Sequence, residues 1–292
     1  MSEGEAAARD GAGSPTPADH RALAETLVAH WVERRPRRVG LGGGQGAGKS
    51  TLGRAIERAG RDAGLRIAVL GLDDFYLSRA QRIRLAEAVH PLLETRGPPG
   101  THDIAACRSA MASLLRDEEV ELPRFDKGLD DAGPPRRARG PFDLVLLEGW
   151  CVGASPAPAE ALADPVNDLE RERDPEGVWR RYVNERLGAD YAPVWEELDE
   201  LVFLRVPSLD AVRRWRRQQE ASLPVEQRLG KAGVARFVEH FERITLAMLD
   251  ALPGKADCTV ELDEDHSVGS VSWRPDRARR APSHVASRPG ST

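Results

Sequence analysis

A glycine-rich stretch at residues 42–50, GGGQGAGKS, combines residue types that together could hold a phosphate group. Gly43, four further residues and then Gly48-Lys49-Ser50 match the P-loop pattern. Glycines let backbone N–H groups approach an anion, a lysine can span the β- and γ-phosphates, and a serine hydroxyl can ligate Mg²⁺. The stretch therefore predicts a nucleotide triphosphate site formed by nine consecutive residues: Gly43, Gly44, Gln45, Gly46, Ala47, Gly48, Lys49, Ser50 and Thr51.

The sequence on either side of this loop favours a phosphate site over a flexible glycine linker, which is the alternative. A short strand is expected at 38–41 (RVGL), and a helix is expected from Lys49 to Gly64. A helix that begins at Lys49 would add its positive end to the site.

Carboxylates follow two of the apolar segments. The segment at 66–72 is followed directly by Asp73 and Asp74, and LVLL at 144–147 is followed by Glu148. Parallel sheets collect their ligands at the carboxyl ends of strands, so these acids should lie beside the phosphates. A carboxylate at Asp73 or Asp74 could accept the proton of an attacking hydroxyl or hold Mg²⁺ through water, and Glu148 has the Walker-B position that orients the Mg²⁺ shell with Ser50. The alternative is that the aspartates simply begin a solvated loop.

A late helical segment, AVRRWRRQQE at 211–220, carries several arginines. Arg213 is three residues from Arg216 and four from Arg217, so these side chains could share one helical face. Such a cluster could close over the phosphates as a lid near 208–222 and stabilise transition-state charge, although an ordinary solvated face explains it equally well. The chain lacks the guanine-reading Asn-Lys-x-Asp of GTPases and the Leu-Ser-Gly-Gly of transporter ATPases, which leaves a small-molecule kinase.

The elements that must position these residues alternate between strands and helices. Besides 38–41, strands are expected at 66–72, 142–149 and 198–206, with a weaker one at 257–262. Helices are expected between them, for example at 104–117 and 233–249. This alternation predicts an α/β fold with a doubly wound, mostly parallel sheet and helices on both faces.

Composition limits the remaining possibilities. The 292 residues include 42 basic and 47 acidic side chains, a net charge of −5, so no overall nucleic-acid-binding character is present. The three cysteines lie far apart and outside any CxxC, which argues against a disulfide framework or a zinc site. No apolar run approaches the roughly 20 residues that cross a bilayer, and no signal peptide is recognisable. A soluble, cytoplasmic protein without membrane or nucleic-acid partners is expected.

Three regions are expected along the chain. Residues 1–20 are small and polar and predict a disordered leader, and residues 21–272 should form the folded domain. Residues 273–292 are basic and without apolar periodicity, which predicts a disordered tail; a nucleic-acid-binding arm is the weaker alternative.

Six motifs together resemble one family. GGQGAGKST, LDDFYL, RGPPGTHD, LPRFDKG, LVLLEGW and WRRQQE resemble the P-loop kinases related to D-glycerate 3-kinase, a group similar in turn to uridine kinase, phosphoribulokinase and bacterial pantothenate kinase. The likeness runs from about residue 37 to 262. It implies the P-loop kinase fold and ATP- and Mg²⁺-dependent phosphorylation of a primary hydroxyl on a small, anionic metabolite, with D-glycerate as the first candidate.

The resemblance also implies roles for individual residues. Asp73 would be the base, and Lys49, Arg213, Arg216 and Arg217 would act on the transferred phosphoryl group. Acceptor binding would fall to seven residues of the shared motifs: Asp74, Tyr76, His102, Asp103, Arg124, Asp126 and Lys127. A cationic side chain such as Arg124 or Lys127 suits a carboxylate on the acceptor. The alternatives are that His102 is a structural histidine and that PRFDK is a plain turn whose charges face water.

Two segments depart from the family. After Lys127 the chain reads GLDDAGPPRRARG, where the glycerate kinases would have a serine and a longer loop with Gly-Arg-Gly-Asp-Arg. The charged segment at 163–182 is also longer than expected. These departures concern the choice of acceptor, so a nucleoside, pantothenate or a sugar phosphate stays open. A switch or chaperone that binds ATP without transferring phosphate is the alternative outside the enzymes.

Overall fold

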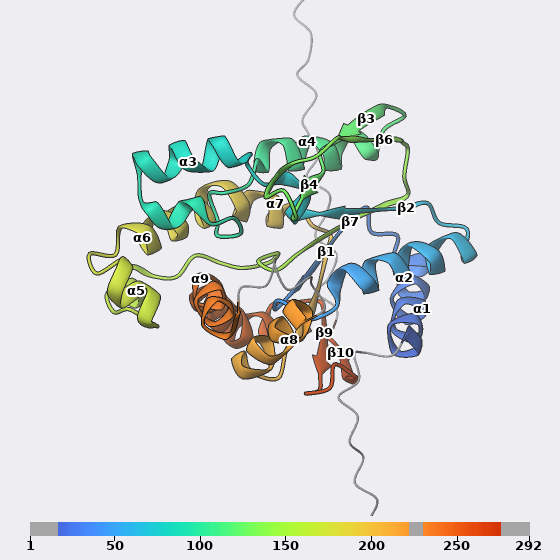
Figure 1. Cartoon of the computed structure of the whole chain (residues 1–292). Coiled ribbons are helices and arrows are strands. Elements are labelled where there is room, and N and C mark those ends of the chain that lie inside the picture. The colour runs from blue at the N-terminus through green and yellow to red at the C-terminus, as the bar shows by residue number, and fades with distance from the viewer. Residues whose placement is uncertain (1–16, 222–229, 276–292) are drawn as a thin grey trace, which may run out of the picture.

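The computed structural model describes residues 17–221 and 230–275, and its centre is a six-stranded sheet (Figure 1). The strand order is β10-β9-β8-β1-β7-β2, with β10 antiparallel and the other five parallel. The strands span β1 (Arg38–Gly43), β2 (Ile67–Gly71), β7 (Leu144–Gly149), β8 (Glu200–Arg205), β9 (Cys258–Leu262) and β10 (Val268–Trp273).

Register brings the candidate residues to one edge of this sheet. β1 lies between β7 and β8, and Leu41 pairs with Glu148 on one side and with Val202 on the other. β2 pairs with β7 so that Gly71 lies opposite Glu148. The ends of β1, β2 and β7 are therefore adjacent, which is where a doubly wound sheet binds its ligands.

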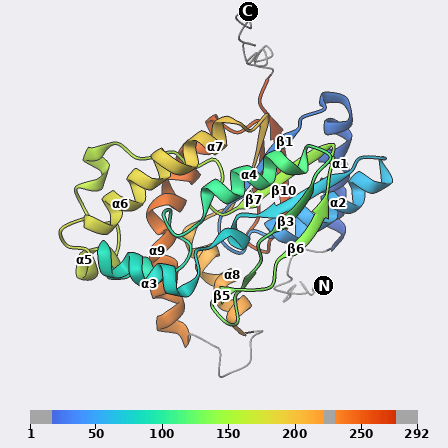
Figure 2. The same ribbon diagram turned by 90° about the horizontal axis from the view of Figure 1, so that it is seen from above.

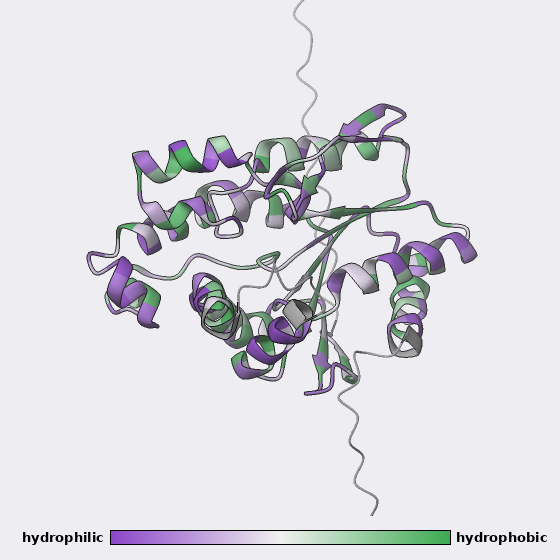
Figure 3. Cartoon of the chain, viewed as in Figure 1, coloured by the Kyte–Doolittle hydropathy of each residue, from purple (hydrophilic) through white to green (hydrophobic). Residues whose placement is uncertain are grey.

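Helices cover both faces of the sheet (Figure 1). α3, α4, α6 and α7 lie over one face, and α1, α2 and α8 lie over the other, whereas α9 packs into the hydrophobic cores on both faces. Figure 3 shows that the hydrophobic residues concentrate in the strands and on the helix sides that face them. The helices span α1 (Pro17–Arg34), α2 (Lys49–Asp62), α3 (Arg79–Ala88), α4 (Ile104–Leu114), α5 (Asp168–Arg173), α6 (Val178–Arg186), α7 (Ala192–Glu196), α8 (Leu209–Ala221) and α9 (Gly230–Ala251).

Alternating strand residues feed two hydrophobic cores. In β7, Val145 and Leu147 join the core under α4 and α7, whereas Leu144 and Leu146 join the core under α1 and α2. Strands buried on both faces must be apolar throughout, which explains why these segments read as continuous hydrophobic runs.

Two small hairpins and the charged segment complete the fold. β3 (Glu119–Leu122) pairs with β6 (Arg136–Arg139), and β4 (Phe125–Asp126) pairs with β5 (Asp131–Ala132). The segment at 163–182 contains α5 and the start of α6. Figure 2 shows α3, α5 and α6 at the end of the molecule opposite α1 and α2.

The predicted fold class is confirmed, and all five predicted strands are present. The structure corrects the boundary of the leader, because residues 17–20 already belong to α1 and His20 is buried against Gly48. It also places Trp273, predicted as the first residue of the tail, at the end of β10. Residues 1–16 and 276–292 and the end of the expected lid at 222 lie outside the described ranges. No described helix has the length and apolar character needed to span a membrane.

Candidate active site

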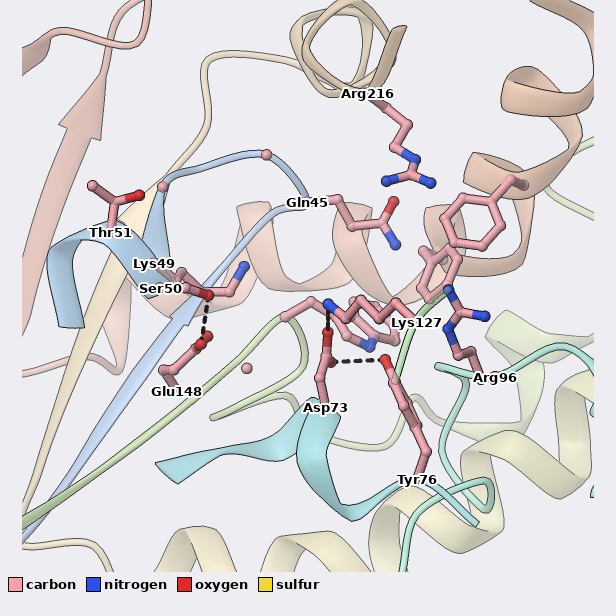
Figure 4. A pocket seen from close by; sticks show the side chains of 16 residues that line it. Gln45, Lys49, Ser50, Thr51, Asp73, Tyr76, Arg96, Lys127, Glu148 and Arg216 are labelled. Carbon is pink, nitrogen blue, oxygen red and sulfur yellow. Dashed lines mark hydrogen bonds and ion pairs between the residues drawn. The ribbon is translucent and has the colours of Figure 1, made fainter. Parts of the chain in front are cut away.

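A cavity of about 240 Å³ opens at the carboxyl ends of β1, β2 and β7 (Figure 4). Its wall contains eleven of the residues predicted from the sequence, together with five that were not predicted. The predicted ones are Gln45, Gly46, Gly48, Lys49, Ser50, Thr51, Asp73, Tyr76, Lys127, Glu148 and Arg216, and the others are Arg96, Gly149, Trp150, Phe237 and Phe241.

The P-loop (residues 43–50) connects β1 to α2 through a conformation that only glycine adopts easily. Gly46 and Gly48 have φ values of 78° and 80°, and Gly48 is the N-cap of α2. The loop therefore directs the free N–H groups at the start of α2 toward the cavity, which is a suitable environment for an anion. Gln45 also points into the cavity, and its buried Oε1 has no hydrogen-bond partner among the described residues.

Lys49 lies across the P-loop. Its Nζ donates hydrogen bonds to the carbonyl oxygens of Gly43 at 2.8 Å and Gly44 at 3.0 Å. Burial lowers the pKa of Lys49, while the nearby carboxylates of Glu148 and Asp73 act in the opposite direction. Bound phosphate oxygens would supply the counter-charge that such a buried ammonium favours.

Ser50 and Glu148 form a pair of oxygen ligands. Ser50 Oγ donates to Glu148 Oε1 at 2.6 Å, and this pair lies beside Lys49 (Figure 4). Burial raises the pKa of Glu148, and the Lys49 charge and the Ser50 hydroxyl oppose that shift. No group of three or more histidine, cysteine or carboxylate side chains in the described ranges could hold a metal alone. The pair fits Mg²⁺, which takes few protein ligands and completes its shell with phosphate and water oxygens.

Asp73 lies on the 3₁₀ turn η1 (Leu72–Phe75), which follows β2 directly. Its Oδ1 accepts a hydrogen bond from Tyr76 Oη at 2.7 Å, and its Oδ2 accepts one from Lys127 Nζ at 2.6 Å (Figure 4). Burial would raise the pKa of Asp73, but the charge and hydrogen bond of Lys127 and the bond from Tyr76 outweigh it and lower that pKa to about 2. Asp73 is therefore ionised at neutral pH.

Tyr76 is held in place by aromatic rings. The His102 ring lies 4.5 Å from it and the Phe125 ring meets it edge-on at 5.0 Å, as measured between centroids. Tyr191 Oη accepts a hydrogen bond from Gly100 N–H at 2.9 Å and lies 2.7 Å from His102 Nδ1. Burial lowers the pKa of His102 to about 4, so the ring is neutral. His102 lies behind Tyr76 and does not line the cavity, unlike our expectation for an acceptor-binding residue.

Four other residues expected at the acceptor also lie outside the cavity lining. Asp103 caps α4 by accepting from Ala106 N–H at 2.9 Å, because a short polar side chain can satisfy the first helical donors. Asp74 accepts from Phe125 N–H at 3.4 Å and so ties the strand end to the following loop. Asp126 accepts the N–H groups of Gly128 and Leu129 and shapes a turn, and Arg124 is exposed.

Of the three arginines expected to act from α8, only Arg216 lines the cavity, where its guanidinium lies 4.8 Å from the centre of the Phe237 ring. Arg213 instead pairs with Asp210 on its own helix and with Glu242 on α9. Arg217 is exposed. The structure thus does not bring Arg213 and Arg217 to the site, because the buried Trp215 fixes the rotation of α8.

One cation that lines the cavity was not predicted, and neither were three aromatic residues, Trp150, Phe237 and Phe241, which we call the aromatic wall. Arg96 lines the cavity and is paired with Asp130. Trp150, Phe237 and Phe241 also line it, and Trp150 meets Phe241 edge-on at 5.0 Å. Arg96 and Trp150 stand in the quoted motifs RGPPGTHD and LVLLEGW, so a signal existed for them. Nothing in the helical pattern of 233–249 singles out the two phenylalanines.

Comparison with known proteins agrees with this geometry. No protein-family model matches the chain. An uncharacterized kinase of Schizosaccharomyces pombe, mug58, is 34% identical over 225 residues, which is 72% of this chain and 79% of that protein. The chloroplastic D-glycerate 3-kinase of Arabidopsis thaliana is 28% identical over 214 residues, covering 68% of this chain and 44% of that protein.

A solved structure confirms the fold. The D-glycerate 3-kinase of Cryptococcus neoformans superposes with a TM-score of 0.72 at 23% identity and covers 87% of this chain and 99% of that one. The extent of the match to mug58, together with the P-loop and the strand-end carboxylates, shows that the chain belongs to the P-loop kinases that resemble D-glycerate 3-kinase.

Proposed function

We propose that this kinase transfers the γ-phosphoryl group of ATP to the primary hydroxyl of D-glycerate. One observation supports this most strongly: a single cavity contains the P-loop, the Ser50–Glu148 pair and Asp73, with Lys127 and Arg96 beside Asp73. The P-loop side suits a triphosphate, and the Asp73 side suits a small anion that carries a hydroxyl group. The 28% sequence identity to the D-glycerate 3-kinase of Arabidopsis thaliana supports the same acceptor.

The roles of the side chains follow from their positions. The N–H groups at the start of α2 and Lys49 bind the β- and γ-phosphates. A Mg²⁺ ion held by Ser50 and Glu148 supplies charge neutralisation at these phosphates when bound. Arg216 approaches the cavity from α8 on the same side as Gln45 (Figure 4) and can neutralise the charge that develops during transfer.

Asp73 receives the proton during the transfer. The oxygen of the acceptor hydroxyl forms a bond to the γ-phosphorus as the bond from that phosphorus to the bridging oxygen of ATP breaks. ADP leaves with the electron pair of the broken bond, and the hydroxyl proton moves to Asp73. The protein contributes mainly by positioning these groups and by neutralising charge.

The test is ADP release from ATP and Mg²⁺ with a panel of acceptors, followed by phosphorus NMR of the products. D-Glycerate should stimulate ADP release well above the rate without acceptor and yield a new phosphomonoester at its primary hydroxyl. A panel in which D-glycerate gives no stimulation would overturn the proposed acceptor. Slow hydrolysis that no acceptor stimulates would indicate an ATP-binding switch instead.

The aromatic wall favours one second candidate, a nucleoside acceptor. Phe237, Phe241 and Trp150 offer flat apolar surface on which a base could stack. Uridine therefore belongs in the panel. The cations beside Asp73 favour an anionic acceptor over it, because a neutral nucleoside could make no charge-assisted pair with Lys127 or Arg96.

A further inference from the structure

The carboxylate of Asp73 is engaged by two donors of different character. Tyr76 donates to Oδ1, and its ring is held by the neighbouring rings of His102 and Phe125. Lys127 donates to Oδ2 at 2.6 Å from a long side chain that is 63% exposed. Of the two partners, Lys127 is the one that can leave without disturbing the fold.

The turn at residues 126–131 positions Lys127 next to a second cation. Asp126 shapes the turn, and Asp130 accepts from Arg96 and from Arg82, whose side chain is fully buried. Arg96 and Lys127 both line the cavity. An anionic group that enters beside Asp73 therefore meets a guanidinium held by Asp130 and an ammonium on an exposed side chain.

We propose that Lys127 blocks Asp73 until the anionic group of the acceptor draws the ammonium away. This proposal rests on the proposed function and deepens it: the required acceptor class is a hydroxyl compound with a carboxylate or similar anion close to the reacting hydroxyl. Moving from one carboxylate to another keeps the ammonium paired, and Asp73 keeps the hydrogen bond from Tyr76. The released oxygen of Asp73 then accepts the hydroxyl proton as the oxygen–phosphorus bond forms and ADP departs.

The electrostatics of Asp73 agree with such a block. A carboxylate whose pKa is held at about 2, chiefly against burial by the charge of Lys127, is a weak proton acceptor. Water that reaches the cavity next to ATP would meet this weakened base. The block should therefore keep ATP hydrolysis slow whenever no anionic acceptor is bound.

The first test compares Lys127→Gln with Lys255→Gln in ATP hydrolysis without any acceptor. Lys255 is an exposed lysine whose partner is Ser155, outside the cavity lining, so it controls for loss of one positive charge. Lys127→Gln should raise hydrolysis about tenfold, since loss of a neighbouring cation strengthens the base, and Lys255→Gln should match the wild type. Circular dichroism confirms folding. A rate unchanged in folded Lys127→Gln would overturn the proposal.

The second test uses D-lactate, which has the carboxylate and 2-hydroxyl of D-glycerate but no primary hydroxyl to phosphorylate. In the wild type D-lactate should stimulate ATP hydrolysis severalfold, because it draws Lys127 away and leaves Asp73 to activate water. In Lys127→Gln, D-lactate should have little further effect. Equal stimulation of both proteins would overturn the proposal, and so would a lack of stimulation in a wild type that phosphorylates D-glycerate.

These readouts separate this proposal from the proposed acceptor. If the wild type phosphorylates D-glycerate but hydrolysis is unchanged in Lys127→Gln, the proposed block by Lys127 is wrong and D-glycerate is supported as the acceptor. If hydrolysis rises in Lys127→Gln but the wild type does not phosphorylate D-glycerate, the proposed block is supported and D-glycerate is excluded as the acceptor.

Discussion

Asp73 and Asp74 are adjacent in the sequence, yet their surroundings give them opposite properties. The pKa of Asp73 is lowered to about 2 because Lys127 and Tyr76 outweigh the effect of burial. The pKa of Asp74 is raised, mainly by burial, although the Phe125 N–H and the charge of Arg136 oppose the shift. Asp73 faces the cavity, whereas Asp74 fastens the loop that carries Lys127. The position of each carboxylate on η1, and not its type, separates these roles.

Replacing Asp73 by Asn should lower kcat by a factor of about 10²–10⁴, since the amide cannot accept the hydroxyl proton. ATP affinity, measured by isothermal titration calorimetry, should stay within about threefold, because the P-loop and Lys49 are untouched. Asp103→Asn is the matched control: asparagine caps a helix as well as aspartate does, so its kcat should equal that of the wild type. Wild-type turnover by Asp73→Asn would refute the assigned base.

Protonation of His102 makes the free energy of unfolding depend on pH. Its pKa is lowered by burial from 6.5 to about 4, so the folded protein holds a neutral ring while the unfolded chain binds a proton below pH 6.5. The resulting stability is complete above pH 6.5 and is lost as the pH falls toward 4. Between pH 7 and pH 5, the wild type should lose about 2 kcal/mol more free energy of unfolding than His102→Gln does. Urea denaturation at both pH values measures this difference, and equal losses would contradict it.

At the scale of the element, α8 shows why spacing alone misplaced two arginines. Arginines occupy four of the five positions at 213–217, with Trp215 between them, so spacing alone does not say which arginine faces the cavity. The structure fixes the rotation through Trp215, which is buried and donates to the Glu264 carbonyl at 3.1 Å. Arg214 pairs with Glu264 as well. Glu264 lies about 50 residues further along the chain, and no pattern near 213–217 predicts these contacts.

The turn at 126–131 makes a second element-scale prediction. Asp130→Asn would remove the carboxylate shared by Arg82 and Arg96, and hydrogen bonds to charged groups contribute about 1.5–3 kcal/mol. The variant should lose about that much stability in urea, and its KM for the proposed acceptor, D-glycerate, should rise several times more than its KM for ATP. Asp131→Asn is the control, because its amide oxygen can still accept the Arg79 N–H. Equal changes in both KM values would show that the turn does not serve the acceptor side.

At the scale of the molecule, the features that could be predicted are those determined by residues close together in the sequence. The five parallel strands are apolar runs because both faces are buried, and the P-loop is one contiguous motif. β10 escaped prediction because most of its residues are exposed and lack a buried face. Arg96 and Phe241 come from segments about 145 residues apart, so only the tertiary fold brings them to one cavity.

The charged segment at 163–182 connects to the helix that forms the aromatic wall. Glu170, which is fully buried, accepts from Arg243 on α9 at 2.6 Å and 2.8 Å. Asn167 donates to the Glu239 carbonyl and to Glu242 on the same helix. The segment therefore fixes α9, from which Phe237 and Phe241 reach the cavity.

A double-mutant cycle measures this connection. Glu170→Leu alone should cost about 3–5 kcal/mol, because it leaves the charge of Arg243 without its partner in a largely buried place. Adding Arg243→Met should cost less than the sum of the single changes, by at least about 1 kcal/mol. Urea denaturation of the four proteins provides the values. Additivity within about 0.5 kcal/mol would show that the pair does not couple α5 to α9.

The contact between α1 and the P-loop has a practical consequence for anyone shortening this protein. A Cβ atom at Gly48 would lie 2.7 Å from His20 Nε2, so the imidazole is packed directly against the nucleotide-binding glycine. A chain cut to begin at residue 21 would lose that packing and should show weakened ATP binding despite an intact P-loop sequence. Truncations, affinity tags and protease cleavage sites therefore belong before residue 17.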